Sequence, residues 1–314
     1  MTSSVALFTD PLFARHETGS HPETPRRLKR VWAALEKHGL TARCERPAFA
    51  PMTPEEISKV HAPSVAERAR LLAEAGGGRL DADTVVCPES YAVALAAAGA
   101  CASAVDAVIA GPTRRALCLI RPPGHHATPD RSMGFCLFNN IALAARRARD
   151  AHGLSRVMIV DWDVHHGNGT QDIFYEDGQV HFLSIHRYGR GFYPGTGAAD
   201  ETGAGRGLGC IRNEAVPSGI TRHDFLERFK TAVAAMADRC KPELILLSAG
   251  FDAHAADPIG ALSLETEDFG DMTRYLLEVA ATHAQGRFAS CLEGGYNLTA
   301  LADSVRVHLE ELLN

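Results

Sequence analysis

The stretch RVMIVDWDVHHGNGTQ, residues 156–171, carries the pattern that decides the fold. It opens with an uninterrupted apolar run, Val157–Val160, and then changes to Asp161, Trp162, Asp163 and two histidines. An apolar run without alternation is typical of a strand buried on both faces, as in a parallel sheet. The polar residues are therefore expected at the carboxyl end of that strand. Ligands bind at this edge in open α/β sheets.

Four other apolar runs have the same character. The expected strands are Ala116–Ile120, Val157–Val160, Val180–Ile185, Leu244–Leu247 and Phe288–Leu292. Helical patterns lie between them or flank them, at Pro25–His38, Ser90–Ala110, Asn140–Ala151, Asp224–Cys240, Asp268–Ala281 and Leu298–Leu313. This alternation predicts a mainly parallel sheet with helices on both faces. The Gly-rich stretch 189–209 is interpreted as a loop, so residues 1–314 are predicted to form one α/β domain.

The composition narrows the classes of function. The 314 residues are 46% hydrophobic and 22% charged, which argues against a disordered chain. A net charge of −6 and a pI near 6.2 argue against a dedicated nucleic-acid-binding protein. We find no apolar run of the roughly 20 residues that span a bilayer and no secretory signal pattern, so a cytoplasmic protein without a membrane partner is expected. The eight cysteines form no C-x-x-C pair and are expected to be reduced and non-catalytic.

Each expected strand is followed by polar residues. These clusters are RPPGHH at 121–126, DWDVHH at 161–166, HR at 186–187, SAGFD at 248–252 and EGGYN at 293–297. Because the carboxyl ends of parallel strands share one edge of a sheet, His, Asp and Tyr side chains from five strands should converge there. That convergence predicts an enzyme.

A metal site is the first expectation for this edge. Asp163 and His165 are two residues apart at a strand end, where alternate side chains point the same way. Together with Asp252 they offer three N and O ligands, the number found in catalytic zinc sites that keep one position open. Asp161 either supports this site from behind or binds a monovalent ion. Water on such a metal has a pKa near 7 and can act as a nucleophile.

Proton transfer is the second expectation. His125 and His126 follow Pro-Pro-Gly, a stiff turn that fixes where both rings point. Adjacent imidazoles beside a metal suit the removal of a proton from water and the protonation of a leaving group. Asp161 and Asn168 are candidate partners that would set the ring tautomers. Tyr296, after two glycines, is placed to bring its hydroxyl to an oxyanion opposite the metal.

Seven motifs together resemble the zinc-dependent histone deacetylase superfamily, most closely its class II-like branch and the bacterial histone deacetylase-like amidohydrolases. They are HPETPRRL at 21–28, RPPGHHA at 121–127, GFCLFNN at 134–140, DWDVHHGNGTQ at 161–171, FYPGTG at 192–197, SAGFDAH at 248–254 and LEGGYNL at 292–298. The motifs follow the family's order over residues 21–298. The resemblance implies a three-layer α/β/α sandwich of the arginase/deacetylase type.

The resemblance also implies the ions and the reacting groups. Its zinc ligands fall on Asp163, His165 and Asp252, its acid–base pair on His125 and His126 with partners Asp161 and Asn168, and its carbonyl-polarising tyrosine on Tyr296. A structural potassium site is implied at Asp161 and Ser184, completed by the carbonyls of Asp163, His165 and Ile185.

Three positions are implied to form the substrate tunnel. Gly134 and Phe135 match the wall that holds the acyl-lysine stem. Tyr193 stands where the family commonly has a second phenylalanine, so the tunnel is expected to be narrower or more polar here. The preference for one substrate over another is expected to depend on this change.

Three further positions are implied at the ends of the tunnel. Asp83 lies near the rim residue that anchors the substrate backbone in relatives. Arg27 matches an arginine of the internal channel through which acetate leaves. Ile259 occupies the place of a glutamate that marks some polyamine-selective relatives, which disfavours a dedicated polyamine enzyme.

We therefore expect a zinc-dependent amidohydrolase that removes acetyl or a related short acyl group from amines such as N6-acetyl-lysine. One Zn²⁺ per chain and a structural K⁺ are the expected cofactors, and an acylated lysine or small acylated amine is the expected partner. The alternatives are an acetylpolyamine or other small-molecule deacylase, a binuclear manganese ureohydrolase and an inactive acyl-lysine-binding relative. A homo-oligomer is left open.

Overall fold

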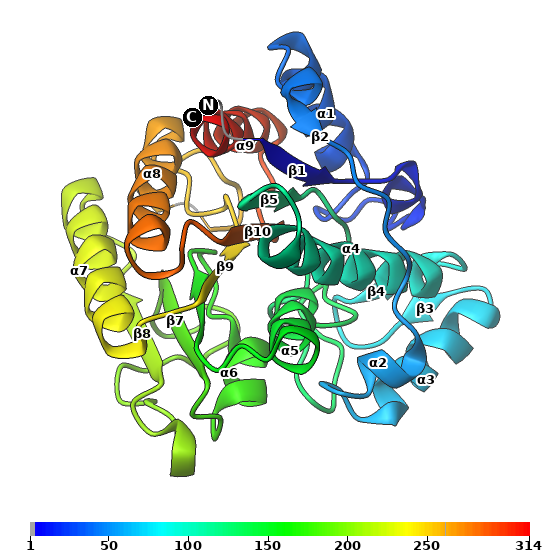
Figure 1. Ribbon diagram of the computed structural model, residues 1–314. Helices are drawn as coiled ribbons and strands as arrows, with labels where there is room; N and C mark the ends of the chain where they lie inside the picture. Colours follow the sequence, from blue (N-terminus) through cyan, green and yellow to red (C-terminus); the bar gives the residue numbers. More distant parts are fainter. Residues whose placement is uncertain (1–3, 261) are drawn as a thin grey trace.

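An eight-stranded sheet forms the middle layer of the computed structural model, which describes residues 4–260 and 262–314 (Figure 1). Its strand order is β2-β1-β5-β10-β9-β6-β7-β8, and each of these neighbouring pairs is parallel. The strands are β1 (Val5–Phe8), β2 (Cys44–Glu45), β5 (Arg115–Cys118), β6 (Val157–Asp161), β7 (Val180–Arg187), β8 (Ile211–Val216), β9 (Leu244–Ala249) and β10 (Phe288–Leu292). The central strands β6, β9 and β10 are buried throughout, as expected for a sheet covered on both faces.

Helices cover both faces of the sheet, which confirms the predicted three-layer α/β/α arrangement (Figure 1). One face carries α4 (Ser90–Ala110) and α5 (Asn140–His152), with α6 (Asn168–Phe174) beside β7. The other carries α7 (Arg222–Cys240), α8 (Thr266–His283) and α9 (Leu298–Leu313), with α1 (Arg26–Lys37) packed on α9. Outside these layers lie α2 (Pro54–Ile57), α3 (Pro63–Glu74) and the antiparallel hairpin of β3 (Gly78–Arg79) and β4 (Val85–Val86). Within the described residues there are also three short 3-10 helices, η1 (Pro11–Arg15), η2 (Thr41–Arg43) and η3 (Gly205–Gly207).

Local capping explains where several helices begin and end. The side chain of Asn139 accepts a hydrogen bond from the Ala142 amide at the start of α5, and Gly153 ends that helix with a positive φ of 66°. Asn297 caps α9 in the same way, directly after the EGGY cluster. These caps therefore fix where the loops before α5 and α9 end and the helices begin.

The structure differs from the predicted strands mainly at the edges of the sheet. β10 has the predicted bounds, whereas β5 spans Arg115–Cys118 instead of Ala116–Ile120. Three outer strands were not predicted: β2 and β8, which form the two edges, and β1, which lies between β2 and β5. β1 and β2 are too short to give a pattern, and only some residues of β8 are buried because it lies at an open edge of the sheet.

Helix α4 corrects the expectation that no segment is long and apolar enough to span a membrane. By length and composition alone, its 21 residues could cross a bilayer. Alanine dominates its sequence, and the helix packs against α5 and β5 with 67% of its most apolar window buried. A core helix made of small apolar residues has the same composition as a membrane span, so this feature carries no functional conclusion.

Candidate active site

The carboxyl ends of β5, β6, β9 and β10 bring four of the five predicted polar clusters to one edge of the sheet, whereas His186 and Arg187 lie within β7 and do not line the cavity there. A cavity of about 160 Å³ opens there. Its lining residues are Asp83, Pro123, His125, His126, Gly134, Phe135, His165, Tyr193, Ile259, Gly294 and Tyr296. Side chains that are distant in the sequence therefore meet in one narrow site.

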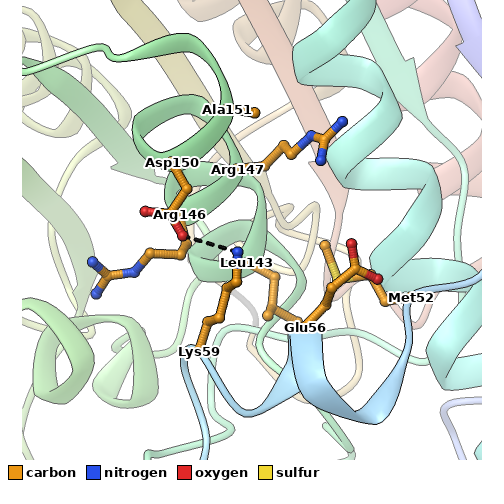
Figure 2. A pocket seen from close by; sticks show the side chains of 8 residues that line it. All are labelled: Met52, Glu56, Lys59, Leu143, Arg146, Arg147, Asp150 and Ala151. Carbon is orange, nitrogen blue, oxygen red and sulfur yellow. Dashed lines mark ion pairs between the residues drawn. The ribbon is translucent and has the colours of Figure 1, made fainter.

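A slightly larger hollow of about 210 Å³ lies between α2 and α5 (Figure 2). Figure 2 shows an ion pair across it, in which Lys59 Nζ lies 3.2 Å from Asp150 Oδ2. Its lining contains neither histidine nor cysteine. The smaller cavity is therefore the better candidate for catalysis.

Three buried side chains form a candidate metal centre at the bottom of the smaller cavity. The nearest ligand atoms of Asp163, His165 and Asp252 all lie within 4.8 Å of one another. His165 Nδ1 is 3.0 Å from Asp163 Oδ1 and 3.2 Å from Asp252 Oδ2. The two carboxylates thus face the same imidazole nitrogen.

Backbone amides hold the carboxylates in this arrangement. The amide of Val164 donates to Asp252 Oδ1 at 2.9 Å, and the amide of Gly294 donates to Asp163 Oδ2 at 2.9 Å. Asp252 Oδ2 is buried and accepts no hydrogen bond of good geometry among the described residues. A buried carboxylate oxygen with no donor is well suited to a cation.

The electrostatics of the cluster also call for a cation. Burial, and then the charge of Asp163, raises the pKa of Asp252 to about 7. Burial opposes the charged form of His165, but Asp163 and Asp252 outweigh it and raise the pKa of this imidazole to about 10. A divalent metal would supply the positive charge that protonated His165 otherwise provides, so the three residues fit a zinc ion.

The two neighbouring histidines make separate hydrogen bonds behind the cavity. His125 Nδ1 lies 2.9 Å from Asp161 Oδ2, and His126 Nδ1 lies 2.7 Å from Asn168 Oδ1. Their ring centroids are 3.9 Å apart. The structure thus places each histidine against the partner that the sequence suggested for it.

These different partners push the two histidines apart in proton affinity. Burial lowers the pKa of His125, but Asp161 and Asp163 more than compensate and raise it to about 10. Burial, followed by the charges of His125 and His165, lowers the pKa of His126 well below its usual value. Their surroundings therefore favour the charged form of His125 and the neutral form of His126, the kind of difference that acid–base catalysis uses.

Tyr296 lies across the cavity on the loop after β10. Its backbone amide donates to Asp257 Oδ2 at 2.7 Å, and its ring packs edge-on against Phe135 at 5.9 Å. The guanidinium of Arg27 lies 5.1 Å from the ring centroid. Burial, and then the charge of Asp252, raises the pKa of the phenol far above its usual value, so Tyr296 remains a hydrogen-bond donor.

The tunnel walls are built from loops on two sides. Gly134 has a φ of +57°, and a β-carbon there would lie 2.6 Å from His126 Cδ2 and 2.7 Å from the Tyr193 hydroxyl oxygen. Only glycine allows the backbone to lie this close to His126 and Tyr193. The Tyr193 ring packs edge-on against His126 at 5.0 Å, and its buried hydroxyl has no partner among the described residues. The wall is therefore more polar than a pair of phenylalanines would make it.

Asp83 and Ile259 also line the cavity, as the resemblance implied. Burial, and then hydrogen bonding and the charge of Asp81, raises the pKa of Asp83 to about 6. The amide of Ile259 donates to Asp257 Oδ1 at 2.9 Å, so Asp257 ties the loop of Ile259 to that of Tyr296. No role was predicted for Asp257, although it stands two residues before the assigned Ile259.

Arg27 is not in the cavity lining but lies behind it, fully buried. It donates to the carbonyls of Glu293 and Gly295 and to Glu23 Oε1, the last at 3.0 Å. Glu23 also binds Arg121 through both carboxylate oxygens, at 2.5 and 2.6 Å. Burial opposes ionisation, yet Arg121 and Arg27 lower the pKa of Glu23 to about 2. This buried cluster clamps the turn that presents Tyr296.

Asp161 and Ser184, the implied potassium ligands, are direct neighbours in the β6–β7 ladder. Ser184 Oγ lies 2.9 Å from His186 Nδ1, and Asp161 also accepts the Asp163 amide at 3.1 Å. Both side chains are fully buried. Their role in binding potassium stays a prediction.

With this geometry in place, comparison with known proteins identifies the family. The histone deacetylase domain matches residues 21–312. The chain belongs to the histone deacetylase family. It is 39% identical to the histone deacetylase-like amidohydrolase of Pseudomonas aeruginosa, an alignment that covers 95% of this chain and 83% of that protein. It is 41% identical to the chloroplastic histone deacetylase 10 of Oryza sativa subsp. japonica, over 92% of this chain and 69% of the other.

A solved structure of the same family supports the fold. The crystal structure of the HDA15 HD domain matches with a TM-score of 0.93 and 37% sequence identity, covering all of this chain and 89% of that one. These comparisons confirm the resemblance that the motifs indicated. They support a deacetylase or amidohydrolase activity for this histone deacetylase family member.

Proposed function

We propose that this histone deacetylase family member is a zinc-dependent deacetylase that hydrolyses the amide of an acetylated or similarly short-acylated amine, with N6-acetyl-lysine as the main candidate. The observation that carries the proposal is that Asp163, His165 and Asp252 converge beside two differently hydrogen-bonded histidines in one cavity. When bound there, zinc would polarise the substrate carbonyl and activate water.

The protein's own side chains divide the remaining work. His126 has the lowered pKa and is the base that takes a proton from water, while Asn168 fixes its ring. Asp161 favours the charged form of His125, which is the proposed acid for the leaving amine. Tyr296 donates its phenolic proton in a hydrogen bond to the oxyanion as the amide is attacked.

The shape of the cavity favours a thin, linear substrate. A volume of about 160 Å³ between Phe135 and Tyr193 suits an unbranched aliphatic stem with a small acyl group. Ile259 offers no charge to a polyamine at the mouth. Acetyl-lysine is therefore preferred to an acetylpolyamine, which stays the second candidate.

Two further assignments belong to the same proposal. Asp161 and Ser184 are proposed to bind a structural K⁺ behind the histidine pair, since both are buried neighbours in the sheet. A cytoplasmic location is proposed because all eight cysteines are free thiols.

The test compares Tyr296→Phe with a matched Tyr275→Phe control, whose hydroxyl donates to the Lys230 carbonyl between α7 and α8. On an acetyl-lysine peptide, Tyr296→Phe should lose roughly 10²–10³-fold in kcat, as for the removal of one oxyanion donor, with zinc content unchanged. Tyr275→Phe should keep full activity.

A second arm tests the metal. Asp252→Asn should lose zinc, measured by elemental analysis, together with activity. Full turnover by Tyr296→Phe would refute the role of the phenol, and zinc retained at wild-type affinity in Asp252→Asn would refute the ligand set. Two manganese ions per active chain would favour a ureohydrolase instead.

A further inference from the structure

Three cysteine thiols meet in the core of the protein, and none of them takes part in the proposed deacetylation. Cys101 lies in α4, Cys118 ends β5 and Cys291 lies on β10. Each residue is at most 1% exposed. Cys118 and Cys291 are direct partners in the β5–β10 ladder, and α4 places Cys101 over them. The cluster therefore joins two strands and one helix.

The sulfur atoms are close enough to share one ligand. All three Sγ atoms lie within 4.8 Å of one another, and the Sγ atoms of Cys101 and Cys291 are 2.9 Å apart. The other polar contact is long, with Cys118 Sγ 3.7 Å from the Ala100 carbonyl. Among the residues that the structure describes, no His, Asp or Glu joins the group. The donor set is thus three sulfurs.

This donor set selects the chemical class of the ligand. Sulfur ligands favour soft, thiophilic cations, whereas a structural zinc site normally has four ligands. We propose that Cys101, Cys118 and Cys291 form a buried second metal site for a soft cation of the Cu⁺ or Cd²⁺ class, held by two or three sulfurs. The site is separate from the Asp163–His165–Asp252 centre and does not depend on the proposed deacetylation.

Charge balance makes such a complex tolerable in an apolar core. Burying an unpaired charge is costly, but Cd²⁺ bound by two thiolates and one neutral thiol, or Cu⁺ bound by one thiolate and two neutral thiols, adds no net charge. Binding releases one thiol proton to solvent for each positive charge of the ion, two for Cd²⁺ and one for Cu⁺, so mass and charge are conserved.

The experiment uses Cd²⁺ as the probe on the zinc-loaded enzyme. Cadmium–thiolate bonds give a near-ultraviolet charge-transfer band, to which the carboxylate and imidazole ligands of the catalytic centre do not contribute. The background is Cys44→Ser/Cys87→Ser, because these are the half-buried thiols. Cd²⁺ is added to the purified protein until the absorbance is constant, and protein is also produced in cadmium-containing medium because the site is closed.

We expect one equivalent of thiolate-bound Cd²⁺ per chain in the background protein. Cys118→Ser and Cys291→Ala should each abolish the band, whereas Cys240→Ser, a buried thiol outside the cluster, should leave it unchanged. Circular dichroism melting checks that each variant is folded. Absence of the band from both preparations, or its survival in folded Cys118→Ser, would overturn the proposal. A Cys101–Cys291 disulfide in the purified protein, detected by mass spectrometry, would also overturn it.

Discussion

Glu293 offers the sharpest test of how the active-site loops are held together. It is 1% exposed, and its Oε2 accepts the amides of Gly124 and His125 at 2.6 and 3.2 Å. Its Oε1 lies 3.1 Å from Ser248 Oγ. One side chain on the loop after β10 therefore fixes the turn that carries the histidine pair.

The magnitude follows from these contacts. Glu293→Ala leaves the amides of Gly124 and His125 buried without an acceptor, at about 1–3 kcal/mol each, so the free energy of unfolding should fall by about 2–6 kcal/mol. Glu293→Gln keeps an oxygen towards both amides and turns its NH₂ towards Ser248, whose hydroxyl can rotate to accept. The glutamine variant should therefore lose far less stability than the alanine variant.

The pH dependence of the free energy of unfolding provides a second test of Glu293. Burial, which outweighs the charge of His125, raises the pKa of Glu293 from its ordinary value of 4.5 to about 8. The folded protein thus binds the Glu293 proton more tightly than the unfolded chain does. This proton's contribution to the free energy of unfolding is therefore complete below about pH 4.5 and is lost as pH rises to about 8. Between these values it should fall by roughly 1 kcal/mol per pH unit, and Glu293→Gln should remove that slope.

The assay is urea unfolding of both proteins at several pH values from about 5 to 9, with zinc content held constant. Wild type should lose stability relative to Glu293→Gln as pH rises through this window. A stability difference that does not change with pH would show that Glu293 stays ionised. Equal losses for Glu293→Gln and Glu293→Ala would refute the claim that its acceptor oxygen holds the histidine loop.

Three other substitutions test separate parts of the structure. In Gly294→Ala the new β-carbon would lie 2.2 Å from Asp252 Oδ2 and 2.5 Å from Asp163 Oδ2, so elemental analysis should show loss of zinc even though the protein stays folded. Gly270→Ala adds a β-carbon inside α8, where its nearest neighbouring atom would be 3.7 Å away. This variant should instead raise the free energy of unfolding by about 0.5–1 kcal/mol in urea titrations. Glu23→Gln leaves Arg27 and Arg121 buried beside a neutral partner and should cost about 3–5 kcal/mol by the same method, whereas a loss below about 1 kcal/mol would contradict the proposed clamp.

The central strands could be predicted because each is an unbroken apolar run that ends in polar residues. The outer strands β1, β2 and β8 could not be predicted. β1 has four residues and β2 has two, and they form only because β5 offers β1 a ladder that the local sequence does not reveal. β8 follows the Gly-rich stretch closely and pairs with β7 at the edge, where burial is incomplete. Whether these strands form therefore depends on pairing in the folded protein rather than on the local sequence.

The residues of the site divide in the same way, into those that local sequence reveals and those that depend on tertiary contacts. Most residues that would touch metal or substrate stand in motifs, and the structure brings them into or behind one cavity, with Arg27 among those behind it. The residues that hold them were missed: Glu23, Arg121, Asp257 and Glu293. Each stands inside a quoted motif or beside an assigned residue, but its role depends on a contact with a distant segment. For Arg121 and Glu23 that contact joins residues 98 positions apart.

These missed residues explain how a site made of separate loops can be rigid. Glu293 binds the histidine turn through its side chain, while its carbonyl accepts from Arg27, which Glu23 also binds. Asp257 fixes the amide of Tyr296 from the opposite side. The loop after β10, which carries Tyr296 and contacts the histidine turn, is therefore held on both sides by buried polar and charged groups. Because a misplacement of about 1 Å at a reacting group can reduce a rate roughly 10²-fold, such groups control catalysis without touching substrate. Substitutions here should reduce kcat more than they change KM, which distinguishes them from substitutions in the tunnel wall.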